Sequence, residues 1–343
     1  MMNDNTINIY GSGKKKQNKK PGKDKSPASI SLDLDNQWSY MKIHGDKGWE
    51  EYPSYFDIFI PHILDILDEL DLRITFFIVG KDAGVEENRK YLKMIVQRGH
   101  EVGNHSYNHE SWLQTYSYQK IEDEIRMAEQ AIEEIAGQKP LGFRGPGFSW
   151  SIDLLKVLEK RGYIYDASTL PTWLGPLARK YYFWKSDLSK EEKMARKELF
   201  GKFSEGYRPL KPFFWDLGEN KKIMEIPVTT MPLFKVPFHM SYLLYLSRFS
   251  LPLMKVYFNT SLYLCKFTGV RPSFLLHPLD IIGGDKLPDL SFFPGMDLPT
   301  ESKVNVFKYV LRKLKEKYRP LTISKFALEI NKSYLKTHTP VKS

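Results

Sequence analysis

Short apolar runs alternate along this chain with longer stretches in which apolar residues recur at every third or fourth position. The short runs predict buried strands, and the longer stretches predict amphipathic helices. The predicted strands are Ile30–Leu34, Arg73–Val79, His100–Asn104, Leu141–Arg144, Ile164–Ala167, Ile223–Val228 and Phe274–Leu276. The predicted helices are Phe59–Leu70, Tyr91–Gln97, Ser117–Ala136 and Ile152–Glu159. This alternation predicts βα units around a parallel sheet.

Polar residues that can bind a metal or move a proton follow several of the predicted strands. Asp33 and Asp35 end the first strand, and His105 and His109 follow the third. The carboxyl ends of parallel barrel strands are where active sites gather. Two histidines four residues apart can reach one point from a helical turn or a tight loop. One carboxylate and two neutral imidazoles would suit zinc or another divalent first-row metal.

The same residues also have ordinary interpretations. A histidine pair at this spacing is compatible with a polar loop or a helix face, and Asp-x-Asp at a strand end is compatible with a turn or a helix cap. If three protein ligands do hold a metal, one coordination position stays open for water, as in catalytic sites. The remaining aspartate would then be placed to accept a proton from that water.

Length and cysteine content narrow the choice of fold and compartment. The chain has 343 residues, enough for one large α/β barrel or two ordinary domains. Its single cysteine, Cys265, excludes an intrachain disulfide and is compatible with a reducing compartment. The first residues are polar, and no apolar stretch of the signal-peptide type follows a basic start. We therefore expect a cytoplasmic protein.

The net charge of +10 is concentrated near the N-terminus. Residues 1–28 combine Gly, Pro and Ser with many lysines, which predicts a disordered basic tail. We expect this tail to be solvated or to lie near a membrane surface. No nucleic-acid partner is expected, because no nucleic-acid-binding motif accompanies the tail. Its clustered lysines are Lys14, Lys15, Lys16, Lys19, Lys20, Lys23 and Lys25.

Two segments are predicted to be insertions in a barrel spanning residues 29–343. Residues 172–222 include a charged stretch at 189–203 that predicts a helix, and we interpret this insertion as a lid. Residues 231–268 are apolar, and the chain has no Asp or Glu from Ile226 to Leu279. Apolar surface with basic residues only is typical of an element in an anionic membrane interface. A helical hairpin buried against the barrel is an equal alternative, and the interrupted apolar runs do not reach the roughly 20 residues of a membrane span.

The order of the motifs resembles that of polysaccharide deacetylases, which form carbohydrate esterase family 4 and include the nodulation-type chitooligosaccharide deacetylases. The resemblance runs from about Ser29 to Asp280 and implies an α/β fold, a distorted and incomplete (β/α)7 barrel, here with helical insertions. The motifs are Asp33-Leu34-Asp35, His105 to His109, Phe143-Arg144-Gly145-Pro146-Gly147-Phe148-Ser149 and Leu275-Leu276-His277-Pro278.

The resemblance also implies a role for each motif residue. Asp33 would be the catalytic base and His277 the acid, and Arg144 would orient Asp33 and keep it ionised. The metal ligands would be Asp35, His105 and His109. Structural alternatives are an ordinary ion pair for Arg144 and a capped strand end for His277.

The chain departs from the family pattern at two points. Leu34 separates the two aspartates that are usually adjacent, and the Asp-Trp pair of the fourth motif is here split into Asp166 and Trp173. We expect Asp166 to support the site and Trp173 to form a wall of it. The predicted substrate-pocket residues are Tyr107, Asn108, Pro146, Asp166 and Trp173.

Together these features predict a metal-dependent hydrolase of carbon–nitrogen bonds that removes an N-acetyl group from an amino sugar. We expect one divalent ion, most simply Zn²⁺, although Co²⁺, Ni²⁺, Mn²⁺ and Fe²⁺ suit the same ligands. The predicted substrate is a surface-polysaccharide or lipid-linked sugar precursor, with peripheral contact to an anionic membrane. The alternatives are a deformylase or another C–N hydrolase of this fold, and a non-catalytic carbohydrate- or lipid-binding module.

Overall fold

The computed structural model describes residues 25–175, 203–330 and 335–340. Its strands form one sheet in the order β10-β6-β7-β5-β4-β3-β2-β1-β8, and β9 also pairs with β1. Every predicted strand is present. The strands are β1 Pro27–Leu34, β2 Thr75–Ile78, β3 Glu101–Asn104, β4 Gly142–Phe143, β5 Tyr165–Asp166, β6 Phe213–Asp216, β7 Lys222–Glu225, β8 Ser273–Leu276, β9 Arg319–Leu321 and β10 Thr337–His338.

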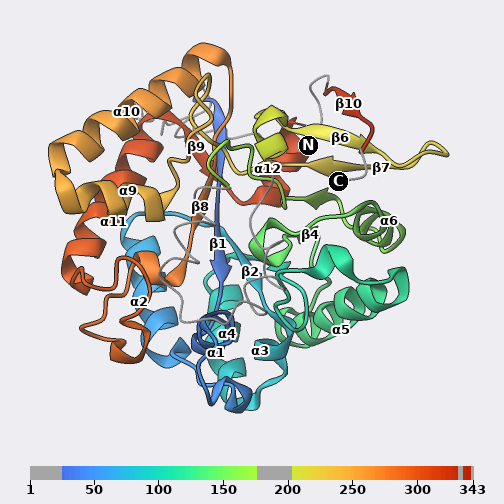
Figure 1. Ribbon diagram of the computed structural model, residues 1–343, viewed down its shortest axis with the longest axis horizontal. Helices are drawn as coiled ribbons and strands as arrows, with labels where there is room; N and C mark the ends of the chain where they lie inside the picture. Colours follow the sequence, from blue (N-terminus) through green and yellow to red (C-terminus); the bar gives the residue numbers. More distant parts are fainter. Residues whose placement is uncertain (1–24, 176–202, 331–334, 341–343) are drawn as a thin grey trace, which may run out of the picture.

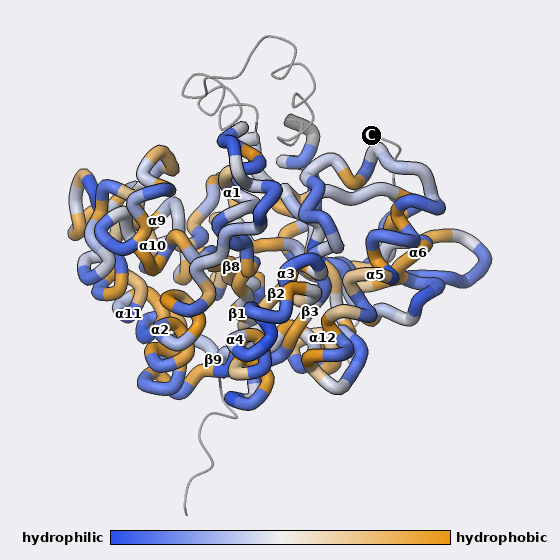
Figure 2. Tube along the Cα trace, turned by 90° about the horizontal axis from the view of Figure 1, so that it is seen from below, coloured by the Kyte–Doolittle hydropathy of each residue, from blue (hydrophilic) through white to orange (hydrophobic). Residues whose placement is uncertain are grey.

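The helices surround the sheet, with α9, α10 and α11 on one side and α5 and α6 on the other (Figures 1 and 2). Buried apolar side chains of β1, such as Ile30 and Leu32, lie in the core between strands and helices. The helices are α1 Gln37–His44, α2 Phe56–Glu69, α3 Gly80–Gly84, α4 Glu86–Gln97, α5 Tyr118–Ala136, α6 Ile152–Lys160, α9 Met240–Phe249, α10 Leu251–Thr268, α11 Thr300–Lys317 and α12 Ile323–Ile330.

Helix α5 shows how the local sequence sets an element that supports the site. The Ser117 side chain accepts the Lys120 N–H at the start of the helix, and Gly137 ends it in the left-handed conformation with φ 69°. Ile121, Ile125 and Ile132 are buried along one face, as the apolar spacing predicts.

The strands from β7 through β5, β4, β3, β2 and β1 to β8 run parallel, in the manner of a barrel. No ladder joins β7 to β8 among the described residues. Instead, the Thr229 N–H donates to the Ser273 carbonyl at 3.0 Å, and the Thr229 hydroxyl accepts the Ser273 N–H at 2.8 Å. These two hydrogen bonds therefore bridge the gap between β7 and β8, just after the end of β7. The predicted distorted, incomplete α/β barrel is confirmed.

Several elements lay beyond the sequence prediction. Within the predicted insertion at 172–222, β6 pairs antiparallel with β7, and β10 adds a further strand beside β6. The helix predicted at about 189–203 and most of the basic tail lie outside the described residues. In the described part of the chain, each helix is too short or too polar to cross a bilayer.

Candidate metal and catalytic site

The candidate chemical residues meet at the carboxyl ends of neighbouring strands. Asp33 lies near the end of β1 and Asp35 just after it, and His105 directly follows β3. Arg144 follows β4, and His277 follows β8. The parallel pairing of these strands brings residues far apart in sequence to one edge of the sheet.

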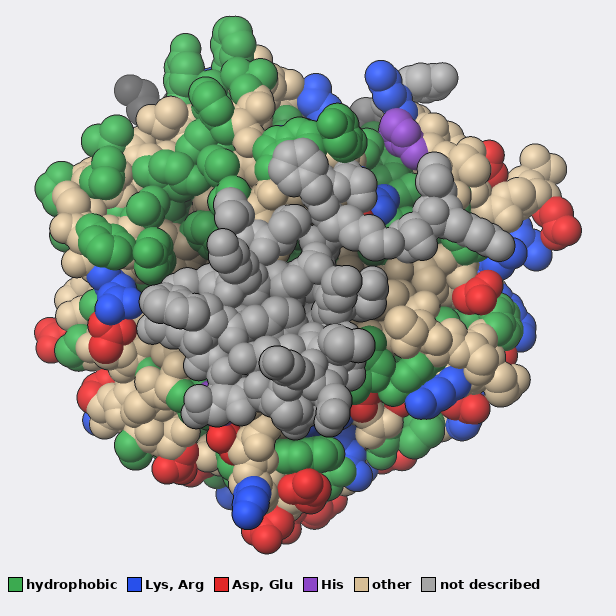
Figure 3. All heavy atoms as spheres, viewed as in Figure 1, with side chains coloured by type: hydrophobic (Ala, Val, Ile, Leu, Met, Phe, Trp, Pro, Cys, Tyr) green, Lys and Arg blue, Asp and Glu red, His purple; other side chains and the backbone are tan. Residues whose placement is uncertain are grey.

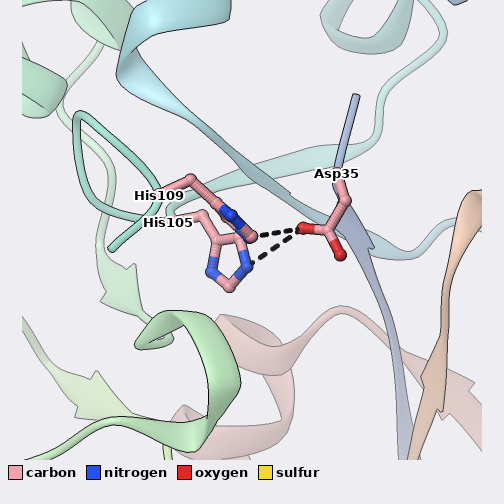
Figure 4. A group of neighbouring side chains, drawn as sticks. All are labelled: Asp35, His105 and His109. Atoms are coloured by element: carbon pink, nitrogen blue, oxygen red, sulfur yellow. Dashed lines mark ion pairs between the residues drawn. The ribbon is translucent and has the colours of Figure 1, made fainter. Parts of the chain in front are cut away.

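Asp35, His105 and His109 form the one potential three-residue metal cluster found among the described residues (Figure 4). The Asp35 Oδ1 atom lies 2.9 Å from His109 Nε2 and 3.4 Å from His105 Nε2. Two ligands of a tetrahedral zinc ion, each about 2.0–2.1 Å from the metal, lie about 3.3 Å apart. The spacing of the cluster therefore suits one small ion.

The loop that carries both histidines is held in an uncommon backbone conformation. Ser106 and His109 have positive φ values, 62° and 52°, in the left-handed region that non-glycine residues seldom adopt. The Asn104 side chain accepts the Ser106 N–H at 2.8 Å. These features fold the loop so that both imidazoles face Asp35. The predicted alternative of a tight loop, rather than a helical turn, is thus the one observed.

Helix α5 also supports this loop through Glu124, which the sequence analysis did not single out. The Glu124 carboxylate accepts the N–H groups of Tyr107 and Asn108 at 3.1 and 2.9 Å, and it also accepts from the Asn108 side-chain amide. Asn108 therefore has a structural contact with α5, and its contact with a substrate stays a prediction. Tyr107 lies against α3, where a Cβ on Gly80 would come within 2.8 Å of its ring.

Hydrogen bonding orients His105 for metal binding. Its Nδ1 lies 2.7 Å from the Arg144 carbonyl, an acceptor, so Nδ1 carries the proton and Nε2 is directed to Asp35. The buried Asp35 Oδ1 makes no hydrogen bond. An imidazole nitrogen and a carboxylate oxygen that face each other need a proton or a cation between them. Three such atoms at one point fit a divalent ion.

The charges in this cluster are tightly linked. Burial would raise the pKa of Asp35, but the neighbouring His109 and His105 hold it well below its usual range. Burial would lower the pKa of His105, but the adjacent Asp35 carboxylate and the charge of Asp33 raise it. A cation bound at this point would take the place of those protons.

Asp33 is fixed by Arg144. The fully buried guanidinium donates from Nη1 to Asp33 Oδ1 at 2.6 Å and to the Ser31 hydroxyl at 2.8 Å, and from Nε to the Ala167 carbonyl at 2.9 Å. These contacts fix the Asp33 carboxylate against the end of β1. A carboxylate held in this way can accept a proton without first reorienting.

Asp166 is fully buried, and its contact with a substrate stays a prediction. It pairs in register with Glu225 on β7, a carboxylate that the sequence analysis did not assign to the site. Burial raises the pKa of Asp166 to about 6, and burial together with the adjacent Asp166 raises that of Glu225 well above its usual value. Because the two carboxyl groups repel each other when ionised, they favour holding one proton between them. Asp166 thus belongs to the buried support around Arg144.

His277 has a carboxylate partner that the sequence analysis also missed. The Asp280 carboxylate accepts the His277 backbone N–H at 2.8 Å and lies 3.7 Å from its Nδ1. Burial opposes protonation, but Asp280, with more distant Asp33 and Asp35, outweighs it and raises the pKa of His277 to about 9. A quarter of the side chain is exposed. His277 can therefore hold a proton at neutral pH and release it to a bound molecule.

The remaining predicted pocket residues lie in different surroundings. Pro146 is buried in a short 3-10 helix, Pro146–Phe148, that follows Arg144. Trp173 packs edge-on against Tyr207 with ring centroids 4.8 Å apart, and the Lys235 ammonium lies 5.7 Å from its ring centroid. Their contact with a substrate stays a prediction.

Part of this arrangement lies in a region that is similar to a known protein family. Residues 45–165, which include His105, His109 and Arg144, match the profile of the polysaccharide deacetylase family. This part of the chain is similar to polysaccharide deacetylases. Asp33, Asp35 and His277 lie outside the matched residues, but the sheet brings them to the same edge as the matched ones.

Two bacterial proteins with a described activity are similar to part of this chain. A peptidoglycan deacetylase of Helicobacter pylori is 32% identical over 114 residues, which cover 33% of this chain and 38% of that protein. A peptidoglycan-N-acetylglucosamine deacetylase of Bacillus cereus is 31% identical over 134 residues, which cover 39% and 58%. In both cases the alignment spans less than two thirds of the relative.

A solved structure supports the fold over nearly the whole length. A protein of Mycobacterium smegmatis assigned to the polysaccharide deacetylases has a TM-score of 0.58 and 18% identity, covering 93% of this chain and 95% of its own. At this identity the similarity supports the barrel fold of the chain and carries no information on its substrate.

Proposed function

We propose that this chain is a metal-dependent N-deacetylase that removes the acetyl group from an N-acetylated amino sugar. The observation that carries the proposal is that three groups of side chains with different chemical roles lie at one edge of the sheet. These are the cluster of Asp35, His105 and His109, the aspartate fixed by Arg144, and the proton-bearing His277. Amide hydrolysis needs a base for water and an acid for the departing amine.

Each residue has a defined task in this proposal. The metal, for which zinc is our choice, would supply activation of water and polarisation of the amide carbonyl when bound to Asp35, His105 and His109. Asp33 accepts the proton that water loses as its oxygen attacks the carbonyl carbon. His277 donates a proton to the nitrogen as the C–N bond breaks, so the products are acetate and a free amine. Arg144 keeps Asp33 in position throughout.

The substrate class follows from the relatives and from the chain itself. The two relatives are a peptidoglycan deacetylase and a peptidoglycan-N-acetylglucosamine deacetylase. For this chain we propose a surface-polysaccharide precursor that carries an N-acetylamino sugar. The location of the protein in the cell stays a prediction, which cell fractionation would check.

Metal analysis combined with an activity assay distinguishes the residues that bind the metal from the residue that acts as the base. Purified protein should contain about one zinc or related ion per chain, and the Asp35→Ala/His105→Ala double variant should lose it. Asp33→Asn should keep the metal and lose about 10²- to 10⁴-fold in turnover, the range typical of a general base. Plasma mass spectrometry and amine release from N-acetylated chitooligosaccharides provide the two measurements. Unchanged turnover in Asp33→Asn would show that another group is the base.

A further inference from the structure

Helix α10 has an apolar face toward solvent as well as one toward the core. Its buried face includes Met254, Phe258, Leu262 and Cys265. Its outward face carries large apolar side chains at a spacing of three and four residues, with Thr260 between them. The exposed fractions are 54% for Leu253, 63% for Val256, 63% for Tyr263 and 73% for Phe267. A helix that is apolar on all sides is typical of a protein core or a membrane.

This outward face continues onto neighbouring segments, and Figure 3 shows hydrophobic side chains gathered over α9 and α10. Tyr245 and Phe249 of α9 are exposed and pack ring against ring, 5.2 Å between centroids. Leu233 and Phe234, in the loop before α9, are 69% and 61% exposed. We call these residues with Leu253, Val256, Tyr263 and Phe267 the α9–α10 surface. Contiguous exposed apolar surface of this kind marks an interaction site.

The charged residues of the segment that carries this surface all have one sign. No Asp or Glu occurs from Ile226 to Leu279, whereas five basic residues do: Lys235, Arg248, Lys255, Lys266 and Arg271. Lys266 is exposed beside Phe267. Arg248 reaches outside the segment to pair with Asp297 at 2.6 Å. Basic residues at the border of apolar surface are complementary to an anionic lipid headgroup layer.

The neighbouring helix α11 provides an internal comparison. It packs against both α9 and α10, and its exposed residues include Glu301, Arg312, Glu316 and Lys317. This mixed, charged outer face is ordinary for a helix in contact with water. The neighbouring α11 thus has neither the lack of acidic residues nor the excess of exposed large apolar residues that characterises the α9–α10 surface.

Helix α9 connects this surface to the candidate site. His239 lies at the start of α9, with its ring centroid 6.2 Å from that of His277. The Ser241 hydroxyl lies 3.4 Å from His277 Nδ1. The ten residues of α9 span about 15 Å at 1.5 Å per residue. The surface therefore begins about one short helix away from the predicted catalytic acid.

We propose that the α9–α10 surface lies in the interface of an anionic lipid bilayer and that the substrate is an amino sugar attached to a lipid of that bilayer. The second part of this proposal rests on the proposed deacetylase function. In this arrangement the apolar side chains enter the headgroup boundary, and the exposed Lys266 contacts lipid phosphates. The sugar reaches His277 and the metal cluster while its lipid stays in the membrane.

Vesicle flotation with the full chain tests the surface. The protein should float with phosphatidylglycerol/phosphatidylcholine vesicles, and Tyr263→Ser/Phe267→Ser should reduce this binding by about tenfold or more. Leu328→Ser is the matched control, because Leu328 of α12 is 58% exposed but lies outside the surface. All three proteins keep the lysine-rich N-terminal residues, so their difference reports α10 alone. Equal flotation of the double variant and the wild type, or no flotation of the wild type, would overturn the lipid assignment.

Two further measurements distinguish a lipid-binding surface from a dimer interface and test the lipid-linked substrate. Analytical ultracentrifugation would overturn the lipid assignment if the wild type is a dimer that the double variant dissociates, because a second copy would then cover the surface. Deacetylation of soluble chitooligosaccharide should be equal in wild type and double variant, whereas that of polyprenyl-diphosphate-linked N-acetylglucosamine in vesicles should fall at least about fivefold. Flotation without any amine release from either substrate would support the surface and contradict the deacetylase function.

Discussion

At the scale of single residues, the site depends on pairs in which one member fixes the charge or the position of another. Arg144 holds Asp33, the Arg144 carbonyl orients His105, and Asp280 favours the protonated form of His277. Asp33, His105, Arg144 and His277 were predicted from motifs. Asp280 was not, because a carboxylate three residues after a histidine has many ordinary roles, and only the fold shows what it faces.

The partner of His277 leads to a pH prediction. The acid form of His277 is needed, so activity should be lost as pH rises through its pKa of about 9. Asp280→Asn removes the main contribution that raises this pKa. The basic limb of the kcat/KM profile should then move to lower pH, while activity well below the shifted pKa is largely kept. Asp297→Asn, which changes an exposed carboxylate paired with Arg248, is the control and should leave the limb in place. If the basic limb of the pH profile does not shift in Asp280→Asn, a group other than His277 determines that limb.

At the scale of elements, α5 holds the metal-binding loop and α9 joins the site to the apolar surface. The amphipathic pattern predicted α5 almost to the residue, since the Ser117 cap and Gly137 are local signals. The prediction left residues 231–268 open between a buried hairpin and a membrane-facing element. The structure shows a helical hairpin with one buried and one exposed apolar face, so features of both interpretations are present.

The contact between α5 and the loop can be tested directly. Glu124→Gln replaces the carboxylate that accepts two backbone N–H groups of the loop with an amide that is a weaker acceptor. We expect metal affinity to fall about 10- to 100-fold, the effect typical of residues that orient metal ligands. Competition with a chromogenic chelator measures the affinity. Glu133→Gln on the exposed side of the same helix should leave it unchanged, and an equal loss in both variants would point to a general effect on α5.

At the scale of the whole molecule, the metal ligands come from segments separated by about seventy residues and meet only through the β1–β2–β3 register. Folding therefore assembles the cluster, and a metal that binds the cluster should stabilise the fold by mass action. At zinc concentrations 100 times Kd the expected gain is about 2.7 kcal/mol. This should raise Tm by several degrees in a chain of this size. Calorimetry with zinc and after chelation would show it, and Asp35→Ala should remove the difference.

The sequence by itself determined the parallel strands from β7 to β8, the helices α2, α4, α5 and α6, and the residues with chemical potential, because hydrophobic spacing, caps and ordered motifs are local. It also determined the acid-free composition of residues 226–279. Only the tertiary structure decided that Asp35 faces both histidines, that Asp166 is buried beside Glu225, and that Glu124 and Asp280 support the site. It likewise decided which apolar residues of α10 remain exposed. Those outcomes depend on strand register and helix packing, which join distant segments and leave no periodic signal in the chain.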